Sequence, residues 1–327
     1  MEQALKSTSL PALARRFLLF PNRLSLVSFQ DLLLSRSFQR RGLIPVSVNI
    51  PPSAAGAAAT IHIWIPAEPR HSLPPLVLIH GFGANAKWQW DRQIGPLSRF
   101  FNLYVPDLIH FGGSRSDGKD FSVGFQSRCL AAAMKQLGVS KYSVVGISYG
   151  GYVAYRLATD AGPAVVDRVV IMTAGIGATA EETKALAEKE KRDVSEILLP
   201  RKPEDLMALM RRSMHRPPRW MPTFLLRDFI GVMYTQHRKE RVELLKELLT
   251  KGVGIDPLPV LDQQTLIMWG DQDNVFPLHL AHRLQRHLGE KSRLEIISDA
   301  GHALQLDKSN CVTDLIENFM LDKLDDS

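Results

Sequence analysis

The chain has 327 residues, of which 45% are hydrophobic and 23% are charged, which favours a large globular domain and excludes a wholly disordered chain. The net charge of +6 is mild, and neither a zinc-finger spacing nor a basic run interleaved with aromatic residues occurs, so we predict no nucleic-acid partner. The 2 cysteines give no metal cluster or disulfide framework, and no apolar run reaches the ~18 residues of a spanning helix. We therefore predict no metal and no cofactor, and an intracellular, cytoplasmic location.

Residues 1–55 differ in composition from the rest of the chain and are expected to form an N-terminal extension. Arginines recur between residues 15 and 41, whereas Glu2 and Asp31 are the only acidic residues of the segment. Three interpretations are open: helices packed on the domain, an amphipathic segment through which residues 1–50 contact a membrane or lipid, and an organelle transit peptide.

Regular elements follow, and they alternate between strands and helix-length segments. The strands are predicted at 61–65, 76–79, 102–105, 143–145, 165–172, 265–269 and 294–297. A helix is predicted from Val123 to Leu137, ending at Gly138 as its C-cap. This alternation predicts a mostly parallel sheet covered on both faces, built from residues 56–175 and 257–327.

Residues 176–256 break this rhythm, because they are rich in charge and helix formers and contain no strand candidate. We predict a helical lid that packs over the functional edge of the sheet. Its methionines and aromatic residues either form the core of the lid or line an apolar substrate pocket. The arginines at 211, 212, 216 and 219 either attract an anionic head group or membrane surface, or form a solvated face.

A serine framed by glycines follows the strand predicted at 143–145. Gly146-Ile147-Ser148-Tyr149-Gly150 matches Gly-x-Ser-x-Gly, and the residues after it are typical of a helix. In this context the serine sits on a sharp strand-to-helix turn, where Gly146 and Gly150 let neighbouring backbone approach without clashes. The motif predicts Ser148 as a nucleophile; the alternative is a tight turn whose serine has no catalytic role.

A second glycine-rich loop, His80-Gly81-Phe82-Gly83, directly follows a predicted strand. Such a loop supplies a backbone N–H to an oxyanion, so we predict the Phe82 N–H as one donor. The N–H of Tyr149, the residue after the nucleophile, is the predicted second donor. His80 is expected to order the loop, with Gly81 and Gly83 as supporting residues.

A serine hydroxyl also needs a base, and the base needs an acid that orients it. Asp271 and Asp273 follow the strand predicted at 265–269, and His302 follows the strand predicted at 294–297. Both segments lie at carboxyl ends of strands, where open α/β sheets bind ligands. We predict Asp273 as the acid and His302 as the base, with Asp271 as a rival acid that can instead hydrogen-bond the turn.

Taken together, these motifs resemble the α/β-hydrolase superfamily. The matching pieces, in order, are HGFG at 80–83, PDLIHFGGS at 106–114, GISYGG at 146–151, WGDQD at 269–273 and GH at 301–302. The resemblance implies an eight-stranded, mostly parallel sheet flanked by helices, with a helical lid between the sixth and seventh strands. It also implies a catalytic triad of Ser148, Asp273 and His302, with Phe82 and Tyr149 as oxyanion donors. Within the superfamily the chain is most similar to monoacylglycerol-lipase-like and small esterase members with a helical lid.

The residue at the turn narrows the expected chemistry. Members that open epoxides or remove halogens carry an aspartate there, so Ser148 favours acyl transfer to water. We predict a carboxylic ester hydrolase whose partner is a small-molecule ester with an apolar acyl or aromatic group. Two alternatives stay open: a ligand receptor on the same fold with slow or no turnover, and an acyltransferase that uses an alcohol instead of water.

Overall fold

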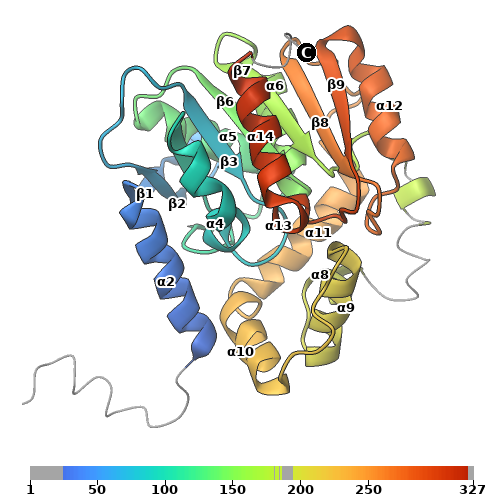
Figure 1. The fold of residues 1–327 in the computed structure, drawn as a ribbon. Helices are drawn as coiled ribbons and strands as arrows, with labels where there is room; N and C mark the ends of the chain where they lie inside the picture. The colour runs from blue at the N-terminus through green and yellow to red at the C-terminus, as the bar shows by residue number, and fades with distance from the viewer. Residues whose placement is uncertain (1–24, 180, 184, 186–193, 323–327) are drawn as a thin grey trace, which may run out of the picture.

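The computed structural model describes residues 25–322, with the exception of 180, 184 and 186–193. Residues 1–24 of the predicted extension and part of the predicted lid therefore lie outside the described residues. In the described part, a central sheet lies between two layers of helices, and a further group of helices covers one end of the sheet (Figure 1).

The described residues form a nine-stranded sheet, in which β5 pairs with β2 beside an eight-strand path ordered β1-β2-β4-β3-β6-β7-β8-β9. The strand β2 is antiparallel to β1, β4 and β5, and the other pairings of the path are parallel. The strands are β1 Leu43–Ile50, β2 Ala59–Pro66, β3 Pro75–Ile79, β4 Asn102–Pro106, β5 Arg115–Ser116, β6 Tyr142–Ile147, β7 Val166–Met172, β8 Gln264–Gly270 and β9 Ser292–Ile297. The predicted mostly parallel sheet flanked by helices is confirmed.

Alternate residues of each strand point to opposite faces of the sheet, and each face has its own helices. Val77 and Ile79 of β3 join the apolar core under α5, α6 and α12, whereas Leu76 and Leu78 join the core under α4 and α14. Outside the lid, the helices are α2 Leu26–Arg40, α3 Pro52–Ala55, α4 Ala86–Leu97, α5 Val123–Gln136, α6 Tyr149–Ala161, α12 His279–Leu288, the 3₁₀ helix η1 Gly289–Lys291, α13 Leu304–Asp307 and α14 Ser309–Met320. The central strands β3, β4, β6, β7 and β8 are therefore mostly buried on both faces, whereas Ile296 of β9 is exposed.

The sheet begins earlier in the chain than the predicted boundary at residue 55. Residues 43–50, assigned from the sequence to the extension, form β1 and pair along their whole length with β2. Leu43, Val48 and Ile50 are buried, whereas Ile44 is exposed. An edge strand buries only part of its residues, so its alternation is weak, and the polar residues and proline between the apolar ones obscure it further.

The helix α2 lies against α4 and the lid. Asp31 of α2 accepts hydrogen bonds from Lys87 Nζ at 2.6 Å and from Trp88 Nε1 at 2.9 Å. At the start of the helix, the Val27 N–H donates to Asp228 Oδ2 at 2.9 Å. Among the described residues, no helix combines the length and the apolar character that crossing a membrane requires.

The lid lies between β7 and β8 and, in the described residues, contains no strand. Its helices include α8 Val194–Leu198, α9 Pro203–Ser213, α10 Thr223–Met233 and α11 Arg238–Lys251. Leu206, Ile230 and Leu245 belong to an apolar core of the lid, which also contains Val27 of α2. The described part of residues 176–256 is thus a helical layer with its own core, placed over the carboxyl ends of the parallel strands (Figure 1).

Candidate active site

Ser148 forms the turn between β6 and α6. Its backbone has φ 52° and ψ −119°, a conformation that is strained for a residue with a side chain. The tight turn requires the two flanking glycines: a Cβ on Gly146 would lie 2.2 Å from the Gly150 carbonyl oxygen, and a Cβ on Gly150 would lie 2.3 Å from the Ile79 carbonyl oxygen. The packing therefore holds Ser148 at the strand end in one orientation.

His302 and Asp273 are brought together from two neighbouring strand ends. His302 Nδ1 lies 3.0 Å from Asp273 Oδ2, and the side chains are 12% and 1% exposed, respectively. The other carboxylate oxygen of Asp273 accepts the N–H groups of Val275 at 2.7 Å and Phe276 at 3.0 Å. An ionised carboxylate only accepts hydrogen bonds, so Nδ1 carries the proton and Nε2 is left as the basic nitrogen.

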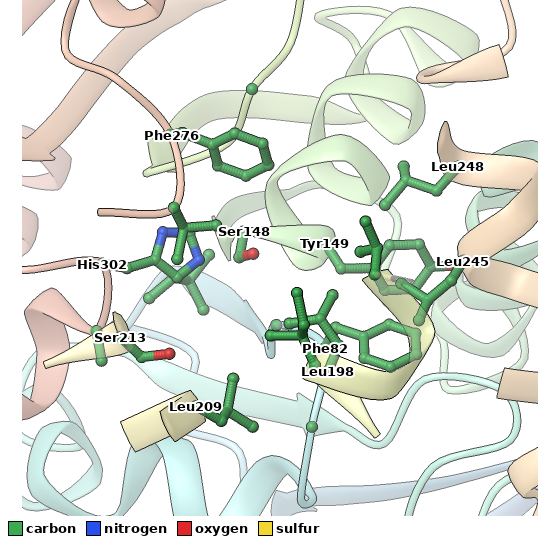
Figure 2. Close-up of a pocket in the computed structure, with 18 of the residues that line it drawn as sticks. Phe82, Ser148, Tyr149, Leu198, Leu209, Ser213, Leu245, Leu248, Phe276 and His302 are labelled. Atoms are coloured by element: carbon green, nitrogen blue, oxygen red, sulfur yellow. The ribbon is translucent and has the colours of Figure 1, made fainter. Parts of the chain in front are cut away.

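The imidazole of His302 and the hydroxyl of Ser148 face each other across the pocket (Figure 2). No hydrogen bond joins Ser148 Oγ to His302 Nε2 in the described residues; before substrate binds, such bonds are often long. The rival acid Asp271 is exposed, and its carboxylate approaches only the Ala300 N–H, at 3.4 Å. The geometry pairs Asp273, and not Asp271, with the histidine.

Two residues that sequence reasoning did not single out hold the backbone around His302. Thr173, which is fully buried with φ 43°, donates its hydroxyl to the His302 carbonyl at 3.0 Å. Asp307 Oδ2 accepts the N–H groups of Gly301 and of the lid residue His215, each at 2.9 Å. Asp307 therefore ties the loop of His302 to the end of α9. Neither residue belongs to a recognisable motif.

The loop after β3 faces the start of α6. Tyr149 is the first residue of α6, so its N–H has no acceptor within the helix, and the N–H of Phe82 has no acceptor among the described residues. Gln89 of α4 fixes this loop, because its amide accepts the Gly81 N–H at 2.8 Å and donates to the carbonyls of Gly81 and Gly83 at 3.1 and 2.8 Å. Among the described residues, these two N–H groups near Ser148 thus have no acceptor.

His80 is fully buried under this loop. Its Nε2 accepts the Leu108 N–H at 2.9 Å, so Nδ1 carries the proton and donates to the Gly81 carbonyl at 2.7 Å. Burial lowers the pKa of His80, which keeps the ring neutral. The side chain links the loop to the segment after β4 and does not reach the pocket, as expected for a structural histidine.

Asp107, within the PDLIHFGGS segment, holds the adjoining loops. Its carboxylate accepts from the Ala86 N–H at 2.9 Å, the Gly113 N–H at 3.1 Å and His62 Nδ1 at 2.9 Å. Burial alone would raise the pKa of Asp107, but the hydrogen bond and charge of His62, the charge of His80 and the Ala86 N–H together lower the pKa. Asp107 stays ionised and fixes the N-terminus of α4, from which Gln89 projects.

Ser148, Tyr149 and His302 open into a cavity of about 1360 Å³ between the sheet and the lid. Its lid side is lined by apolar side chains that include Leu198, Leu209, Met210, Leu225, Leu245 and Leu248. Of the lid methionines and aromatic residues noted in the sequence, Met210, Met214, Met221 and Phe229 line the cavity, Met207 is buried in the lid core, and Trp220 and Phe224 are exposed. Apolar side chains predominate in the lining, which also includes the charged residues Arg212, Lys251 and Asp256.

Comparisons with known proteins place this geometry in context. A family model described as alpha/beta hydrolase fold matches residues 74–309. An uncharacterised protein of Mycobacterium tuberculosis is 26% identical over 305 residues, which cover 86% of this chain and 85% of the relative. Epoxide hydrolase 3 of Xenopus tropicalis is 26% identical over 266 residues, which cover 76% of this chain and 71% of that relative. The solved structure of a bacterial membrane phospholipase A superposes with a TM-score of 0.77 at 21% identity and covers 96% of both chains, a likeness of fold.

Proposed function

Since the chain belongs to the α/β-hydrolase fold family, we propose that it is a serine hydrolase that cleaves carboxylic esters with a large apolar acyl group. The observation that carries the proposal is that Ser148 and His302 line one largely apolar cavity and that Asp273 lies within hydrogen-bond distance of His302. A hydroxyl on a strained turn, an imidazole and an orienting carboxylate are the parts that acyl transfer requires.

In the proposed mechanism, His302 Nε2 takes the proton of Ser148 as the hydroxyl oxygen attacks the ester carbonyl. Asp273 keeps the Nδ1 proton in place and stabilises the imidazolium that forms. The N–H groups of Phe82 and Tyr149 hold the tetrahedral oxyanion, a contribution of roughly 10²–10³ in turnover for each donor. The imidazolium then protonates the leaving alcohol, and His302 activates a water that releases the acid from the acyl-enzyme.

The cavity supports an apolar substrate larger than a typical drug-sized ligand. Small-molecule pockets usually measure about 300–1,000 Å³, and this cavity measures about 1360 Å³. Leu198, Leu209 and Leu248 of the lid surround the space beside Ser148 (Figure 2). These side chains would pack on an aliphatic or aromatic acyl group, which makes a monoacylglycerol or another long-chain ester the favoured substrate class.

Similarity to an epoxide hydrolase does not extend the proposal to epoxide opening. Epoxide-opening members carry an aspartate at the turn, and this chain carries Ser148. A serine alkoxide attacks an acyl carbon and leaves an ester that water cleaves, so the same machinery fits ester hydrolysis.

A fluorophosphonate probe tests the nucleophile directly. We expect wild-type protein to become labelled on Ser148 and the Ser148→Ala variant to stay unlabelled. Ser213→Ala is the matched control, because Ser213 also lines the cavity but lies on α9, away from the turn. Equal labelling of wild type and Ser148→Ala would refute the assignment.

A panel of p-nitrophenyl esters with short to long acyl chains, together with a monoacylglycerol and aromatic esters, tests the substrate class. The large apolar cavity predicts a kcat/KM that rises with chain length. A single slow burst without turnover would favour the ligand receptor, and a transfer product formed with added alcohols would favour the acyltransferase.

A further inference from the structure

Large apolar side chains are exposed on two elements that flank the active-site cavity. On α2, Leu26 is 51% exposed and Phe29 is 57% exposed; on the lid, Trp220 is 77% exposed and Phe224 is 63% exposed. Single exposed apolar residues are common on protein surfaces, but contiguous ones indicate an interaction site. Trp220 and Phe224 lie in one short lid segment, and most of the surface of each is exposed to water. They therefore indicate an interaction site on the lid.

The exposed residues of α2 form one stripe along the helix. Leu26, Phe29, Leu33, Arg36 and Arg40 are spaced by three and four residues in turn, so they share a face, and all five are exposed. The stripe is apolar in its N-terminal half and basic in its C-terminal half.

The opposite face of α2 already has its partners. It carries the buried residues Val27, Leu34 and Phe38, of which Val27 belongs to the lid core and Phe38 to the core under α4 and α14. The exposed stripe therefore has no role in holding the helix in place.

The lid segment next to α2 has the same composition. Trp220 lies just before α10, and Phe224 and Arg227 are three residues apart on that helix, which places them on one face. Arg216, Arg219 and Arg227 are exposed, and no acidic residue occurs between residues 214 and 227. Within residues 214–227, the charged residues that accompany the exposed aromatic residues are thus all basic.

The two elements are joined into one surface. The Val27 N–H of α2 donates to Asp228 Oδ2 of α10 at 2.9 Å, and the N-terminal end of α2 lies beside α10 (Figure 1). Leu26 of α2 and Met221 and Leu225 of the lid segment also line the active-site cavity. The surface thus adjoins the cavity that contains Ser148.

We propose that this surface, the docking face formed by Leu26, Phe29, Leu33, Trp220, Phe224 and the adjoining arginines, binds the protein peripherally to an anionic lipid bilayer. Leucine, phenylalanine and tryptophan side chains enter the boundary between head groups and acyl chains, and the arginines contact the anionic head groups. The exposed arginines next to the aromatic residues select this partner, because their positive charge complements an anionic membrane surface.

Docking in this orientation would place the cavity against the bilayer. Leu26, Met221 and Leu225 would then lead from the lipid to Ser148, so an acyl ester could pass from the membrane into the cavity without crossing water. This consequence rests on the proposed ester hydrolysis, whereas the binding itself does not.

Vesicle flotation of the full-length protein tests the binding. Wild type should float with vesicles of phosphatidylcholine and phosphatidylserine, float less at high salt, and stay behind with phosphatidylcholine alone. The triple variant Phe29→Ser, Trp220→Ser, Phe224→Ser should lose the association, and Arg219→Glu with Arg227→Glu should weaken it by at least about fivefold per arginine. The matched control is Val260→Ser, which removes an apolar residue that is 58% exposed and precedes β8 at the opposite end of the sheet.

Three outcomes would overturn the proposed membrane binding. In the first, wild type does not float with anionic vesicles, and in the second, the triple variant floats as wild type does. In the third outcome, the only change in the triple variant is a smaller oligomer. The last result would assign the face to contact with a second copy of the chain. Ser148→Ala should float like wild type, so a failure of ester hydrolysis is separable from a failure of binding. The triple variant should cleave a soluble short-chain ester at the wild-type rate, which shows that it is folded.

Discussion

Replacing Gly150 with alanine probes how closely the nucleophile turn and the oxyanion loop are fitted to each other. The new Cβ would lie 2.3 Å from the Ile79 carbonyl oxygen and 2.5 Å from the His80 carbonyl oxygen, whereas ordinary contacts begin at 3.4 Å. These neighbours are backbone atoms and cannot rotate away, so the turn and the loop must separate by about 1 Å. A displacement of ~1 Å at an active site can cost about 10²-fold, and overpacking costs ~1–3 kcal/mol of stability.

We therefore expect Gly150→Ala to fold with a lower unfolding temperature and to lose about 10²-fold in kcat, because the Phe82 and Tyr149 N–H groups no longer converge on one oxyanion. Ester turnover and thermal unfolding measured on the same samples separate the two effects. Gly231→Ala is the matched control: its Cβ meets nothing within 4 Å, and alanine in a helix adds roughly 0.5–1 kcal/mol of stability. Wild-type kcat in Gly150→Ala would refute the reasoning.

Three further perturbations have defined outcomes. Asp273→Asn should lower kcat by about 10⁴, because an amide no longer fixes the tautomer of the histidine, whereas Asp271→Asn should keep the wild-type rate; equal losses would contradict the assigned acid. Asp307→Ala leaves the Gly301 N–H and a lid N–H without their acceptor, at ~1–3 kcal/mol each, so hydrogen exchange should accelerate at the histidine loop and at the end of α9 and leave α5 unchanged. Burial first, then the neighbouring His237, lowers the pKa of His110 from 6.5 to about 4. As the pH drops, this histidine takes up a proton in the unfolded chain before it does so in the folded protein. The free energy of unfolding should therefore fall by roughly 3 kcal/mol between about pH 6.5 and about pH 4. In urea unfolding, His110→Asn should lose much of this pH dependence.

Much of the fold could be predicted from the sequence because its signals are local. The strands from β2 to β9, apart from the two-residue β5, appear as short apolar runs, and the turn at Ser148 is marked by Gly146 and Gly150, which have no room for a side chain. The strand β1 was missed, because an edge strand at Leu43–Ile50 buries too few of its residues to leave a clear pattern.

Some residues of the candidate site could be predicted from the sequence, and others could not. Residue type and position at strand ends indicate Ser148 and His302, since such residues act through chemistry that few side chains have. The sequence does not indicate the residues that hold Ser148 and His302 in place, which are Gln89, Thr173 and Asp307. These residues act through hydrogen bonds to distant backbone, and no sequence pattern distinguishes a residue that makes such bonds from one that does not.

The sequence by itself determined the parallel sheet and the helical lid and predicted the serine chemistry, because spacing within a strand, turn or helix expresses these features directly. Only the tertiary structure decided that Asp273 and not Asp271 meets His302, and that Asp307 ties the lid to the histidine loop. It also decided that the N-terminal end of α2 lies beside α10, next to the cavity. The physical reason is common to all three: each depends on which surfaces of elements far apart in the chain pack together, and the local spacing of side chains does not encode that packing.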